Sequence, residues 1–480
     1  MKTKLIFTTL ILLLVSIQSC KKNDVTYEKL INSDQTDIAQ VKFAKILAPA
    51  LANSYELRKF LKAEALKQFD KDYDILYQLI RNKKVGDITV SELLSSYAES
   101  KEDFASIENN FPLLTILIPT VPNFTPENWN VSTEIPQVAV ALSDKKDVPM
   151  YDKSGKATIV PSGCVPTIPV VVVKQNERVV VSQGTSLKSQ KISVNGNSSF
   201  SFVDEAFDGT NTTKLKRTAL PSDIDPIIVE AYNLGMEWQR DHVYYGLTPT
   251  NTQGSYRNNY SEFLTSFRFL EGPPGLYKIM DQQPDPGIPT YVTSTALIFD
   301  GASRWTNGFF EFKVTVVING KNGVGQTLTK GFSARGSDLF DITYGHYILN
   351  ICRIVKIAPK TYNPNLELIP WDLESYGTAW KFIISEFDVS EEVTQTVENT
   401  TTYAGNFEFN TKFGLKFGAS ATTSEKNTFS IKSYLSSDEL YEAVLTFDQP
   451  IIIGVSNGVY TTREISTGWV SIGVEPKRIF

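Results

Sequence analysis

The side chains best suited to catalysis or metal binding are few in this chain. Its 480 residues include three cysteines, Cys20, Cys164 and Cys352, and two histidines, His242 and His346. A site with three histidine ligands is therefore excluded within one chain. A nucleophilic cysteine needs a histidine beside it, but no family motif surrounds Cys164 or Cys352. The motifs of serine hydrolases, zinc proteases and phosphate-binding loops are absent from the sequence. We therefore assign no catalytic, metal-binding or cofactor-binding residue.

A run of alternating aspartates, Asp70-Lys71-Asp72-Tyr73-Asp74, begins like a calcium-binding loop. Such a loop needs glycine at its sixth position and glutamate at its twelfth, where this chain has Ile75 and Arg81. We therefore expect these carboxylates to lie on a solvated face of a helix. Hydrolases that place two carboxylates in a cleft show no fixed spacing in sequence, so that class stays open as an alternative.

Composition limits the class of protein. Hydrophobic residues make up 41% of the chain and charged residues 21%, which is typical of a globular protein. The formal net charge is −6 and no basic run stands out, so a nucleic-acid partner is not expected. A chain of this length has room for roughly two to four domains.

The first twenty residues predict export and a lipid anchor. Two lysines precede an apolar stretch, residues 5–17, which is shorter than the about 20 residues that a membrane-spanning helix needs. The following Ile17-Gln18-Ser19-Cys20 resembles the bacterial lipobox, with a small residue before the cysteine. The resemblance implies that residues 1–19 are a signal peptide, that Cys20 becomes a lipidated N-terminus and that residues 20–35 form a tether. We therefore expect a protein anchored in the bacterial cell envelope, at the outer membrane.

The other two cysteines, Cys164 and Cys352, form an even pair in a chain that is expected to be exported. In an oxidising compartment they could join in one disulfide. Each could equally serve as a small buried apolar side chain. The sequence leaves both interpretations open.

Helical spacing of apolar residues predicts a small α-helical module at residues 36–110. One helix is expected to run through residues 57–80. Thr89 and Glu92 match a capping box, which predicts the start of a further helix that ends near residue 100.

The rest of the chain is predicted to be mainly β, in β-sandwich-like domains. Proline-rich turns and short runs of valine, isoleucine and aromatic residues are typical of such domains. We expect a β-rich middle domain at residues 111–290 and a C-terminal sandwich-like domain at residues 291–480. The expected strands are residues 138–142, 170–173, 178–182, 295–299, 309–317, 347–357, 380–387, 442–447, 451–455 and 469–474.

The most unusual pattern lies in residues 389–435. Polar and apolar side chains alternate between residues 406 and 422, and residues 424–427 are predicted to turn the chain into a returning strand. This pattern resembles the amphipathic hairpins of the aerolysin and epsilon-toxin class, which implies a membrane-facing strand. A long sandwich strand with one face on the core explains the same alternation. The apolar face carries Phe407, Phe409, Phe413, Leu415 and Phe417.

A wider resemblance covers residues 43–181. The segment FAKILAPALANSYELRKFLKAEALKQFDKDYDILYQLI is followed by FPLLTILIPTVPNFTPENWNVSTEIPQVAVAL and then by PVVVVKQNERVVV. This order of motifs resembles a group of uncharacterised lipoproteins from Bacteroidota. The resemblance implies an exported, lipid-anchored protein and brings no catalytic residues with it.

These observations favour a non-catalytic binding role at the membrane, with a glycan, a peptide or a protein as the ligand. Two alternatives stay open, a β-pore-forming or membrane-perturbing protein and a hydrolase with paired carboxylates. Several aromatic residues could form a platform for sugars, although packing in a sandwich core explains each of them as well. They are Trp238, Tyr244, Tyr245, Trp305 and Trp371.

Overall fold

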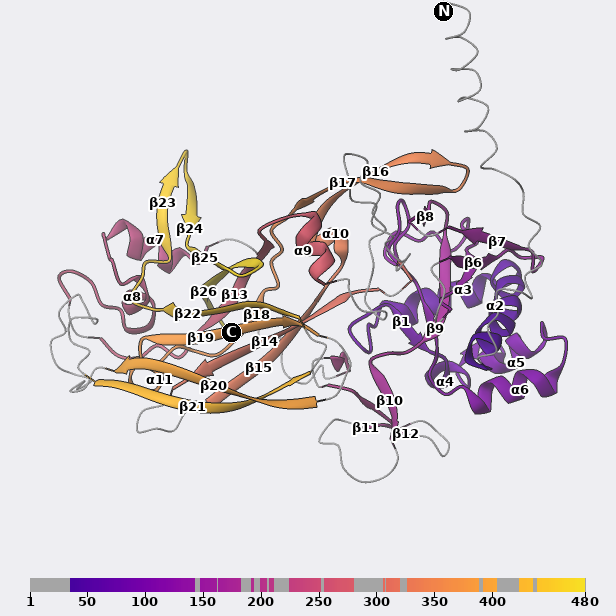
Figure 1. Cartoon of the computed structure of the whole chain (residues 1–480), viewed down its shortest axis with the longest axis horizontal. Coiled ribbons are helices and arrows are strands. Elements are labelled where there is room, and N and C mark those ends of the chain that lie inside the picture. The colour runs from indigo at the N-terminus through magenta and orange to yellow at the C-terminus, as the bar shows by residue number, and fades with distance from the viewer. Residues whose placement is uncertain are drawn as a thin grey trace, which may run out of the picture.

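The protein consists of two lobes that lie side by side along its long axis (Figure 1). The N-terminal lobe contains the longest helices and one mixed sheet, and the C-terminal lobe is built mainly from antiparallel strands. The fold is mainly β with helices at the N-terminal end, as the sequence predicts. The computed structural model describes residues 35–142, 147–161, 163–182, 191–193, 199–204, 207–210, 224–251, 254–279, 305–306, 308–319, 326–387, 392–403, 423–434 and 438–479.

Helices pack against a six-stranded sheet in the N-terminal lobe. Helix α2 (Gln35–Asn53) buries Phe43, Leu47 and Leu51 and contacts β5, β6 and β9. The helices and the sheet share one hydrophobic core, so the helical region and the strands after it form a single packed unit. The sheet order is β1-β4-β9-β5-β6-β7. Its strands are β1 (Asp74–Leu76), β4 (Leu114–Leu117), β5 (Gln137–Val140), β6 (Val148–Tyr151), β7 (Ala157–Val160) and β9 (Val170–Gln175). The other elements are α3 (Tyr55–Ala65), α4 (Tyr77–Ile80), α5 (Val90–Ser95), α6 (Lys101–Asn110), β2 (Lys84–Val85) and β3 (Ile88–Thr89).

The predicted start of the helix at Thr89 is confirmed, although this helix ends at Ser95 and not near residue 100, and another helix prediction is wrong. The Thr89 hydroxyl accepts the Glu92 N–H at 3.1 Å, and the Glu92 carboxylate accepts the Thr89 N–H at 2.8 Å, which completes the capping box of α5. The helix expected over residues 57–80 ends early as α3, and β1 follows it. Gln68 and Lys71 adopt φ angles of 48° and 62°, which a right-handed helix does not contain.

Two four-stranded sheets surround a common core in the C-terminal lobe. Their orders are β18-β13-β26-β25 and β15-β14-β19-β22. Phe267 on β13, Phe312 on β14 and Trp380 on β19 belong to the same hydrophobic core. This is the sandwich-like arrangement that the sequence predicts. The strands are β13 (Tyr260–Phe269), β14 (Phe310–Ile318), β15 (Gln326–Ala334), β18 (Leu366–Glu367), β19 (Ala379–Glu386), β22 (Glu439–Thr446), β25 (Glu464–Thr467) and β26 (Val470–Arg478). The helices are α7 (Pro226–Asn233), α8 (Gln239–Tyr245), α9 (Pro273–Lys278), α10 (Gly336–Leu339) and α11 (Leu373–Tyr376).

Smaller groups of strands join the lobes or extend from them. The hairpin of β16 (Phe340–Ile348) and β17 (Ile351–Pro359) pairs with β8 (Val165–Pro166), which connects the C-terminal lobe to the N-terminal part of the chain. A second hairpin consists of β23 (Ile452–Ser456) and β24 (Val459–Thr462). A small sheet has the order β10-β12-β11, with β10 (Val179–Ser182), β11 (Lys191–Ser193) and β12 (Ser199–Phe202).

The hairpin predicted within residues 389–435 exists, but with different arms. β20 (Glu392–Tyr403) pairs with β21 (Thr423–Tyr434) along twelve residues of each strand. The turn predicted at residues 424–427 is wrong, because Ser424 and Asn427 lie inside β21 and pair with β20. Threonine and valine in β20 favour a strand and provide this partner. The predicted membrane-facing side chains lie outside the described residues, and they are Phe407, Phe409, Phe413, Leu415 and Phe417.

Cys20 and the predicted signal peptide also lie outside the described part of the chain. Within the described ranges, every helix is too short or too polar to cross a membrane. The lipid anchor therefore stays a prediction from the sequence.

Candidate functional site

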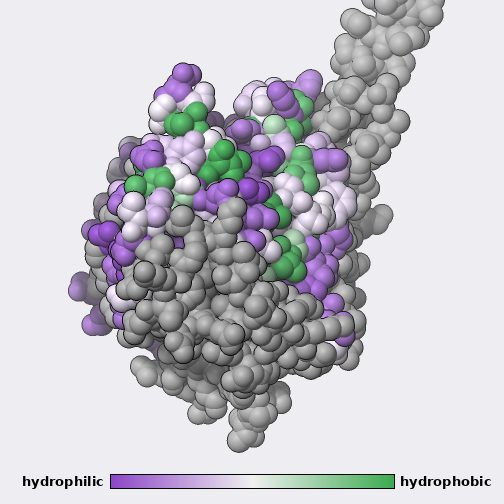
Figure 2. Space-filling view, turned by 90° about the vertical axis from the view of Figure 1, so that its left-hand side faces the viewer, coloured by the Kyte–Doolittle hydropathy of each residue, from purple (hydrophilic) through white to green (hydrophobic). Residues whose placement is uncertain are grey.

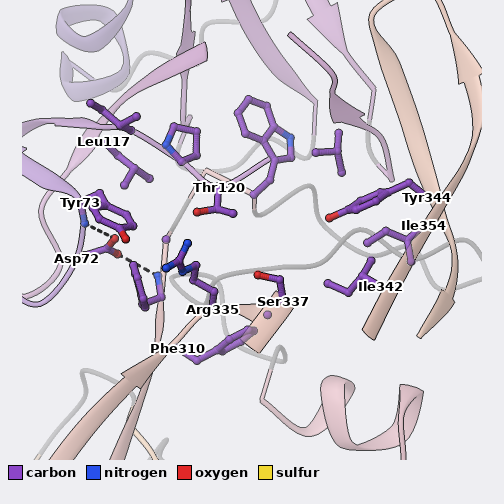
Figure 3. A pocket seen from close by; sticks show the side chains of 17 residues that line it. Asp72, Tyr73, Leu117, Thr120, Phe310, Arg335, Ser337, Ile342, Tyr344 and Ile354 are labelled. Atoms are coloured by element: carbon purple, nitrogen blue, oxygen red, sulfur yellow. Dashed lines mark hydrogen bonds between the residues drawn. The ribbon is translucent and has the colours of Figure 1, made fainter. Parts of the chain in front are cut away.

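A cleft lies between the two lobes, close to the β16–β17 hairpin (Figure 3). Its empty volume, part of which is open to solvent, is about 620 Å³. The N-terminal lobe contributes Tyr73 and Thr120, and the C-terminal lobe contributes Phe310, Arg335 and Tyr344. Thr120 and Arg335 face each other in the middle of the cleft, with Tyr73 on one side and Tyr344 on the other.

Three polar atoms in the wall of this cleft are buried without a hydrogen bond to any of the described residues. They are Thr120 Oγ1, Trp305 Nε1 and Arg335 Nε, the last of which lies 3.5 Å from Asp338 Oδ2 without forming a hydrogen bond to it. Such atoms are rare in native proteins, because leaving a buried polar group unsatisfied costs about 1–3 kcal/mol. The two nitrogens can only donate, whereas the Thr120 hydroxyl can donate or accept. Together in one cleft, these atoms would suit a ligand group that is rich in acceptor oxygens.

Aromatic rings and carboxylates position the Arg335 side chain. Its guanidinium lies 5.6 Å from the centroid of the Tyr73 ring and 5.5 Å from that of Phe309. Arg335 Nη2 lies 3.5 Å from Glu127 Oε1, and Nε lies 3.5 Å from Asp338 Oδ2. The Tyr73 hydroxyl donates to Glu127, and burial together with this bond raises the pKa of Tyr73, so the phenol stays neutral. Arg335 therefore keeps one fixed orientation in the cleft.

Asp72 lines the cleft and also belongs to a buried group of charged side chains at the contact of the lobes. We call this group the junction cluster, and it consists of Asp70, Asp72, Asp74, Lys174, Arg178 and Glu311. All three aspartates are 0% exposed, so the expectation of a solvated helix face is wrong. They tolerate burial because Lys174 and Arg178, from the segment around the end of β9, supply positive charge.

Arg178 makes a buried ionic contact between the lobes. Its Nη1 lies 3.3 Å from Asp72 Oδ2 in the N-terminal lobe, and its Nη2 lies 3.0 Å from Glu311 Oε1 on β14. The same Nη2 donates to the Phe309 carbonyl oxygen at 2.9 Å. One guanidinium thus contacts both lobes at once.

Two aspartates of the junction cluster and the neighbouring Glu177 form a group of oxygens with the spacing of a metal site. Oxygens of Asp72, Asp74 and Glu177 lie within 4.8 Å of one another. However, Lys174 Nζ lies 3.0 Å from Asp74 Oδ2 and 2.7 Å from Glu177 Oε1, and Arg178 contacts Asp72. Because the chain places its own cations against these oxygens, we assign no metal to them.

Burial governs proton binding within the junction cluster. It raises the pKa of Asp70 to about 6 and that of Glu311 to about 8, against the opposing effect of Arg178. Burial also raises the pKa of Asp74. Burial alone would lower the pKa of Lys174, but the carboxylates of Asp74 and Glu177 hold it above its ordinary value. The cluster therefore combines permanent cations with carboxyl groups that titrate near neutral pH.

Gly308 lets the C-terminal lobe approach Asp72 closely. Its φ is +85°, and a Cβ atom there would lie 1.9 Å from Asp72 Oδ2. The next residue, Phe309, donates its N–H to the same oxygen at 3.0 Å. This approach of backbone to carboxylate requires a residue without a side chain.

The fold brings Cys164 and Cys352 to neighbouring strands, although they are far apart in the sequence. β8 pairs with β17 so that Cys352 lies opposite Val165, the residue after Cys164. Both cysteines are buried, and no disulfide joins them. Burial, with a smaller contribution from Cys164, raises the pKa of Cys352 to about 11, which keeps that thiol uncharged. Their pairing under oxidising conditions stays a prediction.

Four of the five aromatic residues considered as a sugar platform lie in the core of the C-terminal lobe, and they are Trp238, Tyr244, Tyr245 and Trp371. The fifth, Trp305, lines the cleft. Of the two histidines, His242 is buried with its Nδ1 2.8 Å from the Leu247 carbonyl oxygen, and His346 is exposed on β16. The sequence did not predict Thr120 and Arg335 as site residues. Neither belongs to a motif, and they come close together only because the two lobes pack against each other.

Comparisons with protein-family models, with curated proteins and with solved structures found no match to this chain.

Proposed function

We propose that this chain is a lipid-anchored binding protein of the bacterial cell envelope and that the cleft between its lobes binds the ligand. The set of unsatisfied polar atoms on Thr120, Trp305 and Arg335 carries the proposal. Neither a histidine nor a cysteine is found among the described residues that line the cleft. Asp72 is the one carboxylate among them, and Arg178 pairs with it. The nearby Glu127 carboxylate accepts from Tyr73 and lies 3.5 Å from Arg335 Nη2, so both carboxylates are engaged within the fold, which supports a binding role for the cleft.

The chemistry of the cleft favours a ligand that carries a carboxylate. Arg335 presents a permanent positive charge with planar donors, which match a carboxylate better than a neutral hydroxyl. The Trp305 N–H and the Thr120 hydroxyl supply further donors to the same space. Phe310 and Tyr344 form apolar walls for a sugar ring or a peptide side chain. An acidic glycan or the carboxyl terminus of a peptide has this combination of groups.

Calorimetric titration tests this proposal with the mature chain, residues 20–480, carrying Cys20→Ala. The probes are a glucuronic-acid oligosaccharide, a glucose oligosaccharide of equal length, a tripeptide with a free carboxyl terminus and its amidated form. We expect at least one carboxylated probe to bind. Its neutral counterpart, the glucose oligosaccharide or the amidated tripeptide, should bind at least about tenfold more weakly. Arg335→Met should weaken binding by about tenfold or more, because a hydrogen bond to a charged group contributes about 1.5–3 kcal/mol.

Arg268→Met is the matched control for this titration. Arg268 Nη2 lies 3.8 Å from Glu464 Oε2 on the C-terminal sandwich, and neither residue lines the cleft. Binding should be unchanged in this variant. Failure of both carboxylated probes to bind, or wild-type affinity in Arg335→Met, would contradict the proposal.

The β20–β21 hairpin supports a second candidate function, that of a β-pore-forming protein. Each described arm has twelve residues, more than the about 9–11 that cross a bilayer as a strand. The hairpin contacts the sandwich through a small apolar cluster, in which Val397, Phe429 and Ile431 meet Val317 and Ile383. Separation of the hairpin from this cluster would free it to insert.

Release of a dye from liposomes tests this candidate with the same unlipidated chain. A pore-forming protein should release the dye and form oligomers on the vesicles. Ile383→Ala should accelerate the release, because it removes one of the side chains that hold the hairpin against the sandwich. Intact vesicles with monomeric protein would exclude the candidate and leave the hairpin as part of the sandwich.

A further inference from the structure

The tip of the β16–β17 hairpin exposes three large apolar side chains. Leu349 and Asn350 form its two-residue loop, between the paired residues Ile348 and Ile351. Leu349 is 97% exposed, and Tyr347 and Ile348 are each 62% exposed. Single exposed apolar residues are ordinary, but three consecutive ones at a projecting tip are typical of an interaction surface.

The backbone at this tip is unfavourable for the residue that it carries. Leu349 has a φ of +53°, in the left-handed region. Two-residue hairpin loops usually place glycine, asparagine or aspartate at such positions, because a larger side chain crowds the backbone there. The strained leucine is also almost fully exposed, so it gains little packing within the fold. Strain of this kind is typical of residues that contact something outside the fold.

A second hairpin also exposes apolar side chains. On β23–β24, Ile453, Val455 and Val459 are 51%, 48% and 69% exposed. Both hairpins lie along the upper edge of the molecule in Figure 1 and are well separated from each other, so one flat surface can touch both. Figure 2, which shows the left-hand end of the molecule, has several hydrophobic patches among hydrophilic residues near the top.

The charge of the β16–β17 hairpin indicates what kind of surface this is. Residues 340–360 contain three basic side chains, Arg353, Lys356 and Lys360, and one acidic side chain, Asp341. Lys356 and Lys360 are exposed. Both lie nearer the base of the hairpin than its tip, Lys356 opposite Thr343. Segments that carry both basic and exposed apolar side chains are typical of binding to the surface of an anionic bilayer.

We propose that the tips of β16–β17 and β23–β24 rest on the surface of an anionic lipid bilayer. The apolar tip residues enter the boundary between headgroups and acyl chains, and the lysines meet lipid phosphates. Two separated tips suit an extended flat surface better than a small globular partner. This contact is independent of the ligand cleft. Together with a lipid on Cys20, it would hold the protein in one orientation on the membrane.

Co-sedimentation with vesicles tests the proposal with the mature chain carrying Cys20→Ala. Vesicles of phosphatidylethanolamine and phosphatidylglycerol should bind the protein, and vesicles of phosphatidylcholine alone should bind it more weakly. Leu349→Asn should lower binding to the anionic vesicles by about tenfold, since one buried leucine contributes about that factor or more. Asparagine suits a positive φ, so the melting temperature of this variant should be equal to or above that of the wild type.

Val444→Ser is the matched control, because Val444 is 45% exposed on β22, away from the upper edge in Figure 1. This variant should bind vesicles like the wild type. Wild-type binding by Leu349→Asn, or no binding of the wild type to the anionic vesicles, would overturn the proposal. The proposal would also be overturned if the wild type forms dimers in the absence of lipid and Leu349→Asn abolishes them. The tips would then contact a second copy of the chain.

Discussion

Replacing Arg178 by methionine is expected to lower the free energy of unfolding by about 3–5 kcal/mol, because it leaves buried carboxylates without their cation. Arg178 is 3% exposed and contacts Asp72 in one lobe and Glu311 in the other. Methionine keeps most of the volume and removes the charge. Urea denaturation followed by circular dichroism measures the change.

Arg268→Met is the matched control for this stability measurement too. The Arg268 side chain is 34% exposed, and it pairs with Glu464 at 3.8 Å. A pair of this kind contributes about 0–1 kcal/mol, so the two arginine variants should differ clearly. If the free energy of unfolding falls by the same small amount in both variants, the junction cluster does not hold the lobes together.

Replacing Cys20 by alanine is expected to move nearly all of the protein from the membrane fraction to the soluble fraction. The change removes the thiol that receives the lipid, and each buried CH₂ of an acyl chain contributes about 0.8 kcal/mol to membrane binding. The hairpin tips alone should give only weak, reversible binding. Fractionation of cells that express the full chain, with washes in high salt, measures the distribution.

Cys352→Ala is the control for this experiment, since Cys352 is a buried internal thiol. That variant should stay in the membrane fraction. Mass spectrometry of the wild-type N-terminal peptide should show acyl chains on residue 20. An unmodified N-terminus, or full retention of Cys20→Ala in the washed membranes, would contradict the anchor.

The local elements of this fold follow largely from the sequence. The Thr89 capping box and many of the strands depend on neighbours within a few residues, and the pattern of residue types reports such neighbours directly. The turn at residues 424–427 was mispredicted because the partner of β21 is the threonine-rich β20, which carries a weaker alternation of polar and apolar residues than residues 406–422. Pairing between distant strands is a tertiary property.

The candidate site could not be predicted in the same way. The aspartates at residues 70–74 look like solvent-exposed charges until Lys174 and Arg178 are placed beside them. Likewise, Thr120, Trp305 and Arg335 come from three separate segments and meet only when the lobes pack together. Burial of charge and convergence of donors are properties of the assembled interface, and no spacing in the sequence encodes them.

The indole N–H resonances of protein labelled with ¹⁵N-tryptophan test the central claim most directly. The chain has six tryptophans, and the signal of Trp305 is assigned as the one that disappears in Trp305→Phe. When a carboxylated probe binds the mature chain, the account predicts that this signal moves downfield, because the indole N–H gains the acceptor that it lacks in the structure. A Trp305 signal that stays fixed while the probe binds would show that the cleft is not the ligand site.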